Sequence, residues 1–180
     1  MTLSRARITG ALYLLYFLIA ILAATSIGRV PVVYSDGANL IANAGYVAVT
    51  LLLYRMFKPV SRNAALLALA ISIVGCVVQS LSLFHLAPLH SALPIFGLFN
   101  LTIGYLIFRS TFLPRALGVL MALSGLGWLM TLSPELLRHA AVYIEIVGVA
   151  AEGSLALWLL VMGVNVQRWN EQQDSSTVHA

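Results

Sequence analysis

Two glutamates, Glu145 and Glu152, lie inside an apolar stretch, residues 141–163, that is long enough to cross a membrane. An ionised carboxylate in hydrocarbon costs about 2.5–3.5 kcal/mol even on lenient insertion scales, so each glutamate requires a function or a partner. On a helix, their spacing places both side chains within about 20° of one face and roughly 10 Å apart along the axis. No basic residue lies deep in any apolar stretch. Three interpretations of Glu152 follow: a protonated glutamate, a bound cation or a cationic ligand.

Polar and small residues recur at helical spacing in the other apolar stretches. One stripe holds Asn39, Asn43, Tyr46, Thr50 and Tyr54; others hold Ser72, Gly75, Gln79 and Ser82, then Gly97, Asn100 and Gly104, then Glu145, Gly148 and Glu152. Transmembrane helices associate through small residues and interhelical hydrogen bonds, so these stripes mark inward faces. They are either packing seams, with Glu152 hydrogen bonded to Asn43, Gln79 or Asn100, or the lining of a polar cavity.

Three histidines form a second candidate site. His85, His90 and His139 all fall near the outer ends of apolar stretches, on the same side as Asp36 and Glu135. Three histidines and a carboxylate can ligate zinc, and an open fourth position would make a hydrolytic site. Their spacing matches no familiar metal motif, and interfacial histidines are commonly solvated or bonded to helix ends.

The amino-acid composition argues against several classes of function. The 180 residues are 61% hydrophobic and 9% charged, whereas soluble domains carry about 25% charged residues. No basic patch interleaved with aromatic residues is present, which argues against nucleic acid as a partner. The single cysteine, Cys76, excludes an internal disulfide and a Cys-rich zinc site. Motifs of nucleotide-driven transport and of the common hydrolases are absent from the sequence, and we expect no cofactor.

The apolar stretches predict an all-α bundle of six transmembrane helices, near residues 8–27, 38–57, 64–86, 91–109, 115–133 and 141–166. One side then receives eight basic residues, namely Arg5, Arg7, Arg55, Lys58, Arg62, Arg109, Arg115 and Arg168, and the other receives Arg29 and Arg138. The positive-inside rule therefore predicts that both termini are cytoplasmic. Aromatic residues near the predicted span ends fit an interfacial belt: Tyr13, Tyr54, Trp128, Trp158 and Trp169.

The connections between the spans are short, and we expect no attached soluble domain. Residues 1–169 form the transmembrane domain in this prediction, and the polar residues 170–180 form a disordered cytoplasmic tail. Two inner connections are similar, because residues 54–62 and 108–115 both read aromatic, Arg, a few residues, Pro, Arg. The first apolar stretch exceeds the usual signal-peptide core, so we expect an uncleaved helix.

These connections and the last span resemble a bacterial membrane protein family defined as domain of unknown function 4386. The matching stretches are residues 6–15, 51–55, 58–63, 104–120 and 152–169. The resemblance implies a six-helix integral membrane protein, and it implies no activity. It places Glu152 on a glutamate of the family's last-helix pattern. This chain is shorter than usual between its third and fourth spans, which puts in doubt any function tied to that outer loop.

The sequence thus favours a non-catalytic protein of the bacterial inner membrane. It would bind or transport a small molecule or lipid in a polar cavity lined by Glu145, Glu152, Asn43, Gln79 and Asn100, with Glu152 exchanging a proton as the ligand enters. Membrane lipids are the expected surroundings, and the small size of the bundle favours a homodimer. One alternative is an intramembrane metal-dependent hydrolase at the three histidines. Another is a non-catalytic accessory subunit that binds a second membrane protein through its glycine faces and outer glutamates.

Overall fold

The computed structural model describes residues 2–26, 31–88 and 91–178 of the chain. Within these ranges the structure contains seven helices and no strand, so the predicted all-α class is confirmed. The helices are α1 (Leu3–Ser26), α2 (Val32–Phe57), α3 (Arg62–Leu83), α4 (Leu93–Arg109), α5 (Arg115–Met130), α6 (Pro134–Val161) and α7 (Val166–Val178). Each predicted span overlaps one of the first six helices.

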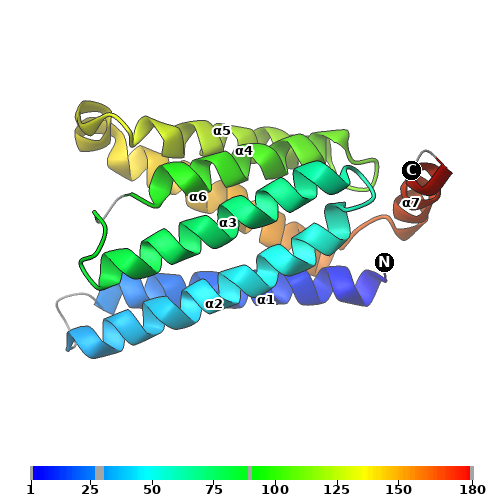
Figure 1. Cartoon of the computed structure of the whole chain (residues 1–180). Helices are drawn as coiled ribbons and strands as arrows, with labels where there is room; N and C mark the ends of the chain where they lie inside the picture. Colours follow the sequence, from blue (N-terminus) through cyan, green and yellow to red (C-terminus); the bar gives the residue numbers. More distant parts are fainter. Residues whose placement is uncertain (1, 27–30, 89–90, 179–180) are drawn as a thin grey trace.

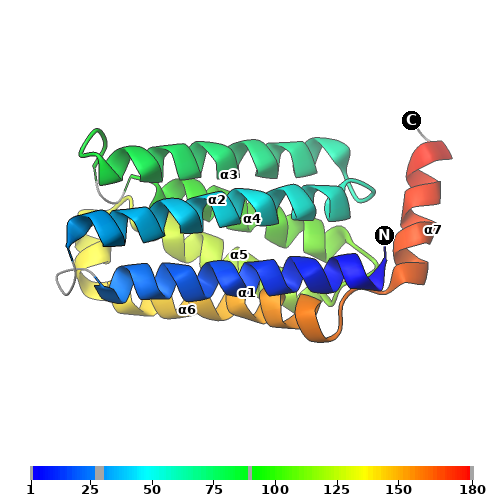
Figure 2. The ribbon, with the colours of Figure 1, turned by 90° about the horizontal axis from the view of Figure 1, so that it is seen from below.

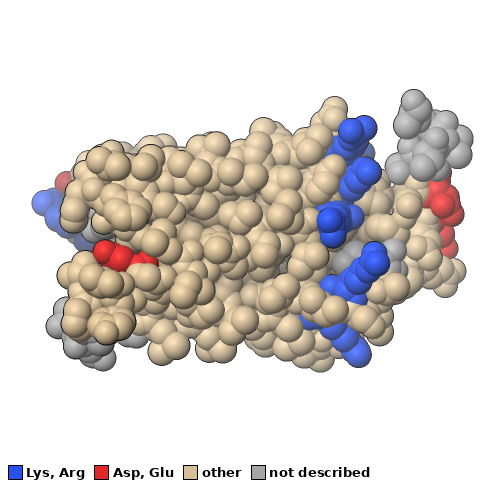
Figure 3. All heavy atoms as spheres, turned by 60° about the horizontal axis from the view of Figure 1, so that its bottom comes forward, with Lys and Arg blue, Asp and Glu red and all other residues tan. Residues whose placement is uncertain are grey.

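The surface and the length of the helices indicate a membrane protein. Helices α1, α2, α3 and α6 are long and apolar enough to cross a membrane, and α4 and α5 are shorter apolar helices. Large apolar side chains point outward along the bundle, among them Leu22, Leu67, Val77 and Leu123, each more than half exposed. Soluble monomers rarely expose apolar patches beyond a few hundred Å². Figure 3 shows a wide belt free of charged residues between the two ends of the molecule.

The first six helices form a closed ring. Each helix packs against its neighbour in chain order, and α1 packs against α6 to close the ring. Short connections make successive helices antiparallel, as Figures 1 and 2 show. Helix α7 lies outside the ring, beyond the end of the bundle at which the N-terminus lies. The core is therefore shared by all six helices, and a residue facing inward can meet partners from several of them.

The ends of α6 differ from the predicted span for identifiable reasons. The helix begins at Pro134 rather than near residue 141, because the Ser133 side chain accepts a hydrogen bond from the Leu136 amide and proline is favoured in the first turn. It ends at Val161 because Gly163 adopts a positive φ of 69°. The amides of Met162 and Gly163 then both donate to the Trp158 carbonyl.

The C-terminal segment also differs from the prediction. Residues 170–178, expected to be disordered, belong to helix α7. The Asn165 side chain accepts a hydrogen bond from the Arg168 amide at the start of this helix. The Trp169 indole is buried and donates to the Met56 carbonyl at 2.8 Å, and Gln172 accepts hydrogen bonds from Thr111. A polar sequence thus becomes ordered because one aromatic side chain anchors it to the end of the bundle.

Glycines allow α4 and α5 to approach closely. A Cβ atom at Gly97 would lie 2.9 Å from the Gly125 carbonyl oxygen, and one at Gly125 would lie 2.7 Å from the Gly97 oxygen. The same reciprocal contact joins Gly104 and Gly118, at 2.8 and 2.9 Å. In each helix the two glycines are seven residues apart, so they share a face. Close backbone approach of this kind is a main source of helix association in lipid.

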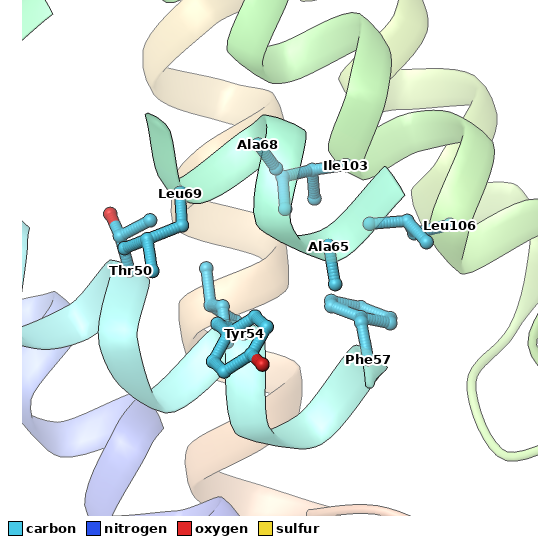
Figure 4. A pocket seen from close by; sticks show the side chains of 9 residues that line it. Thr50, Tyr54, Phe57, Ala65, Ala68, Leu69, Ile103 and Leu106 are labelled. Carbon is cyan, nitrogen blue, oxygen red and sulfur yellow. The ribbon is translucent and has the colours of Figure 1, made fainter. Parts of the chain in front are cut away.

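The space between α2, α3 and α4 near the basic end is packed tightly. Figure 4 shows the side chains that meet there, including Thr50, Tyr54 and Phe57 of α2, Ala65 and Ala68 of α3, and Ile103 and Leu106 of α4. The hollow that remains is too small to hold a water molecule. Small alanines of α3 facing large residues of α2 and α4 explain this fit, and the region serves as a packing core.

The basic residues gather at one end of the ring. The eight residues that the sequence assigns to one side lie at the start of α1, α3, α5 and α7 and at or just past the end of α2 and α4. Figure 3 shows lysine and arginine side chains in a band across this end. At the opposite end the structure describes Arg138, paired with Glu135 at 2.6 Å. Arg29 lies outside the described residues.

We predict that Gly104→Ala destabilises the bundle by about 1–3 kcal/mol, because the new methyl group would press on the backbone of Gly118 and Ala122, which cannot move aside. Thermal unfolding in mild detergent measures the effect. Gly153→Ala is the matched control, since a Cβ there meets no atom within 4 Å. Equal melting temperatures for the two variants would contradict the role of the α4–α5 contact.

Candidate functional site

The carboxyl group of Glu152 lies at the centre of the ring, where α1, α4, α5 and α6 meet. The Tyr13 hydroxyl of α1 donates to Glu152 Oε2 at 2.8 Å. The Asn100 amide nitrogen of α4 donates to Glu152 Oε1 at 2.9 Å and to Ser124 Oγ of α5 at 2.9 Å. Tyr13, Asn100 and Ser124 are essentially inaccessible, and Glu152 is 8% exposed. We call these four residues the Glu152 cluster.

Each helix reaches the cluster through small residues nearby. Gly10, one turn before Tyr13, sits against the backbone of Ala156 and Leu160, which brings α1 close to α6. Asn100 and Ser124 lie between the Gly97–Gly125 and Gly104–Gly118 contacts of α4 and α5. The positions of the polar groups therefore follow from backbone contacts on both sides of them.

The cluster contains no basic residue. Within the described parts of the chain, both ion pairs involve Glu135 at the outer end of α6, and none involves Glu152. The two donors to the Glu152 carboxyl, Tyr13 and Asn100, are neutral. Ionised Glu152 would therefore carry an uncompensated charge in the apolar interior, which is costly. A proton or a bound cation would remove that cost.

The hydrogen bonding of the cluster is compatible with a neutral or a charged glutamate. A tyrosine hydroxyl is both donor and acceptor, so Tyr13 can donate to a carboxylate or accept from a protonated carboxyl. Asn100 Oδ1 is buried and has no partner among the described residues. This oxygen is a free acceptor beside the carboxyl, and buried polar atoms are seldom left without a partner. Asn100 Oδ1 can thus accept a hydrogen bond from one more donor, such as a protonated carboxyl or a water, or it can contact a cation.

An aromatic group joins the cluster to α2. The Tyr13 ring stacks on Phe17 at 5.5 Å and meets the edge of Tyr46 at 6.2 Å. Tyr46 also packs against Phe96 and Phe99 of α4, with centroids 5.4 and 5.6 Å away. Edge-to-face pairs of this kind are favourable and have defined geometry. Tyr13 therefore links the Glu152 carboxyl to Tyr46 by direct contacts.

One turn of α2 from Tyr46, Asn43 lies on a separate cavity of about 380 Å³ between α2 and α3, which is open at the outer surface of the bundle. The Asn43 amide donates to Ser80 Oγ at 3.1 Å and to the Cys76 carbonyl at 3.5 Å. The remaining lining is apolar: Leu40, Ala44, Val47, Ile73, Val77, Leu81 and Phe84. This cavity has the composition of a site for an apolar molecule with one polar group.

The structure brings together only part of the predicted polar set. Asn100 and Glu152 are in direct contact, whereas Asn43 belongs to the α2–α3 cavity. Gln79 is half-buried on α3, and Glu145 is exposed on α6. The two glutamates share a helix face by spacing, but their burial differs.

The histidines are exposed where the structure describes them. His85 follows the end of α3 with a positive φ of 58°, and its side chain is exposed. His139 is exposed on α6, with its Nδ1 atom 2.9 Å from the Glu135 carbonyl oxygen. His90 lies outside the described residues. No group of three metal-ligating side chains occurs within the described ranges, and the proposed metal set at His85, His90 and His139 stays a prediction.

Tyr13 and Ser124 belong to the cluster but were not predicted. The position of Tyr13 in the sequence predicts a place in an interfacial aromatic belt, yet its side chain is fully buried. A usable signal exists, because Ala6, Gly10, Tyr13 and Phe17 recur at helical spacing along α1. Ser124 is one residue before Gly125, whose close contact with Gly97 brings α5 near α4.

We predict that Tyr13→Phe lowers the free energy of unfolding by about 1–2 kcal/mol, because it leaves Glu152 with one hydrogen-bond donor. Tyr16→Phe is the control: its ring packs on Tyr13 and Tyr46, and no described hydrogen bond uses its hydroxyl. Thermal unfolding in detergent compares the two. If Tyr16→Phe were as destabilising as Tyr13→Phe, loss of the bond to Glu152 would not be the cause.

Comparison with known proteins confirms the predicted resemblance. The model of the family described as "Domain of unknown function (DUF4386)" matches residues 88–163, which include α4, α5 and α6. The chain is also 27% identical over 142 residues to an uncharacterized protein of Archaeoglobus fulgidus, an alignment that covers 74% of this chain and 86% of that protein. No solved structure matches the chain significantly. Asn100, Ser124 and Glu152 fall within the segment that the family model matches, and Tyr13 does not.

Proposed function

We propose that this chain is a six-span protein of the bacterial inner membrane with both termini in the cytoplasm. In this proposal it binds or transports a small molecule or lipid, and Glu152 exchanges a proton as the ligand enters. The observation that carries the proposal is the buried Glu152 carboxyl, held by neutral donors alone in the centre of the ring.

The ring arrangement of the helices is evidence for six membrane-spanning helices. Helices α4 and α5 have 17 and 16 residues, about 25 Å of helix each, slightly less than the roughly 30 Å hydrocarbon core. They lie between α3 and α6, both of which are long enough to cross a membrane. A bilayer that contains α3 and α6 must therefore also contain the helices packed between them. A short span is accommodated by local thinning of the bilayer at modest cost.

The distribution of charge supports the orientation. Short connections rich in lysine and arginine remain on the cytoplasmic side of inner-membrane proteins. The basic end of the ring carries the start of α1 and also α7, so both ends of the described chain lie on that side.

The aromatic group supports a link between proton exchange and ligand binding. Protonation of Glu152 changes whether Tyr13 donates or accepts, and Tyr13 contacts Tyr46. Tyr46 is one turn from Asn43, whose amide lies on the α2–α3 cavity. A ligand in this cavity that shifts Tyr46 would thereby favour one protonation state of Glu152, and the effect is reciprocal by linkage.

Infrared spectroscopy tests whether Glu152 carries an exchangeable proton. We expect the carbonyl stretch of a protonated carboxylic acid in the wild-type protein, a decrease of this band as pH is raised, and its absence in Glu152→Gln. Glu145→Gln is the matched control and should keep the band, because Glu145 is exposed. A wild-type spectrum without a protonated carboxyl band that depends on Glu152 would overturn proton exchange and favour a bound cation.

Thiol labelling tests the orientation. In a Cys76→Ala background, Leu132→Cys is placed between α5 and α6 and Asn170→Cys on α7, both at exposed positions. A membrane-impermeant maleimide added to spheroplasts should label Leu132→Cys and should reach Asn170→Cys only after lysis. Labelling of Asn170→Cys in intact spheroplasts would place the basic end outside and contradict the proposed topology.

A further inference from the structure

A cavity of about 340 Å³ opens at the basic end of the ring, where α1, α2 and α7 meet. Its lining combines two arginines, two aliphatic residues, one threonine and one tryptophan: Arg5, Ile8 and Thr9 of α1, Leu52 and Arg55 of α2, and Trp169 of α7. None of them belongs to the Glu152 cluster or to the α2–α3 cavity. The site is therefore separate from the one proposed to exchange a proton.

The cavity has positive charge and no compensating acid. Arg5 and Arg55 contribute one guanidinium group each, and the lining contains no aspartate or glutamate. Within the described parts of the chain neither arginine forms an ion pair, because both ion pairs found there involve Glu135 at the opposite end. Two arginines from different helices on one cavity attract an anion, and the planar guanidinium group matches the oxygens of a phosphate.

The other polar groups of the lining are already in use. Thr9 Oγ1 donates to the Arg5 carbonyl at 2.9 Å, and Trp169 Nε1 donates to the Met56 carbonyl at 2.8 Å. The arginines are thus the donors that remain for a ligand. Ile8 and Leu52 give the cavity an apolar wall, which suits a molecule with an anionic group and a hydrocarbon part.

We propose that this cavity binds the headgroup phosphate of an anionic phospholipid. Arg5 lies in the first turn of α1 and Arg55 in the last turn of α2, at the depth where headgroups meet the ends of spanning helices. Basic residues at this depth attract anionic lipids. Trp169 closes the cavity from the α7 side, so the bound headgroup also contacts the helix that follows the last span.

Native mass spectrometry with added lipid tests the site. The purified protein in mild detergent is titrated with phosphatidylglycerol, with phosphatidylcholine of the same acyl chains, and with inorganic phosphate. We expect one phosphatidylglycerol to bind more tightly than phosphatidylcholine. Arg5→Gln/Arg55→Gln should weaken its binding about thirty-fold, as the loss of two lipid-facing cations implies.

The control variant replaces two basic residues that lie at the same end but do not line the cavity. Arg7 and Lys58 are absent from its lining, and Arg7 reaches toward the Val161 carbonyl instead. Arg7→Gln/Lys58→Gln should retain the tight phosphatidylglycerol. Arg5→Lys/Arg55→Lys, which preserves charge and topology, should bind it less tightly than wild type because lysine lacks the planar fork.

Three results would overturn the proposal. The first is equal loss of phosphatidylglycerol in the two glutamine double variants, which would show attraction by overall charge. The second is equal binding of phosphatidylcholine and phosphatidylglycerol. The third is displacement of the lipid by inorganic phosphate at comparable concentration, which would make the site one for a soluble anion. None of these outcomes bears on Glu152, so this inference and the proposed function fail separately.

Discussion

The carboxyl group of Glu152 imposes the strongest constraint on this bundle. An apolar interior cannot solvate it, so its hydrogen-bond partners must come from other helices. Tyr13 supplies one from α1 and Asn100 supplies another from α4, and Asn100 is held in turn by Ser124 of α5. Four of the six ring helices are thus tied to the position of one side chain. The polar groups fix which helices meet and at what depth. Apolar side chains in lipid specify these two properties poorly.

The glycines make these contacts geometrically possible. Short polar side chains reach across a helix interface only where the backbones are close, and Gly97, Gly104, Gly118 and Gly125 provide this closeness on both sides of Asn100 and Ser124. Gly10 does the same between α1 and α6. The glycine contacts and the hydrogen bonds of the Glu152 cluster therefore depend on each other. A larger residue at a glycine would separate the donors from the carboxyl as well as disturb the packing.

Much of the fold could be predicted from the sequence, and the candidate site only in part. Long apolar stretches and stripes of small and polar residues predicted the helices and the inward positions of Asn43, Asn100 and Glu152. The pairing of Asn100 with Glu152, rather than Asn43 or Gln79, could not be predicted, because it depends on which helices are neighbours around the ring. Glu145 and Glu152 share a face of α6 by spacing, yet the surrounding helices cover only Glu152. Helix α7 was missed because its composition is polar, and its order depends on the contact between Trp169 and Met56.

The closure of the ring between α1 and α6 has a consequence for biogenesis. The hydrogen bond between Tyr13 and Glu152 joins residues 139 positions apart, so it forms only after α6 has been synthesised. Until then, the polar groups of Tyr13 and Asn100 lack their carboxyl partner. At the usual rate of about 5–20 residues per second, this open intermediate lasts for seconds. Packing of α6 against α1 is therefore the step that completes the core.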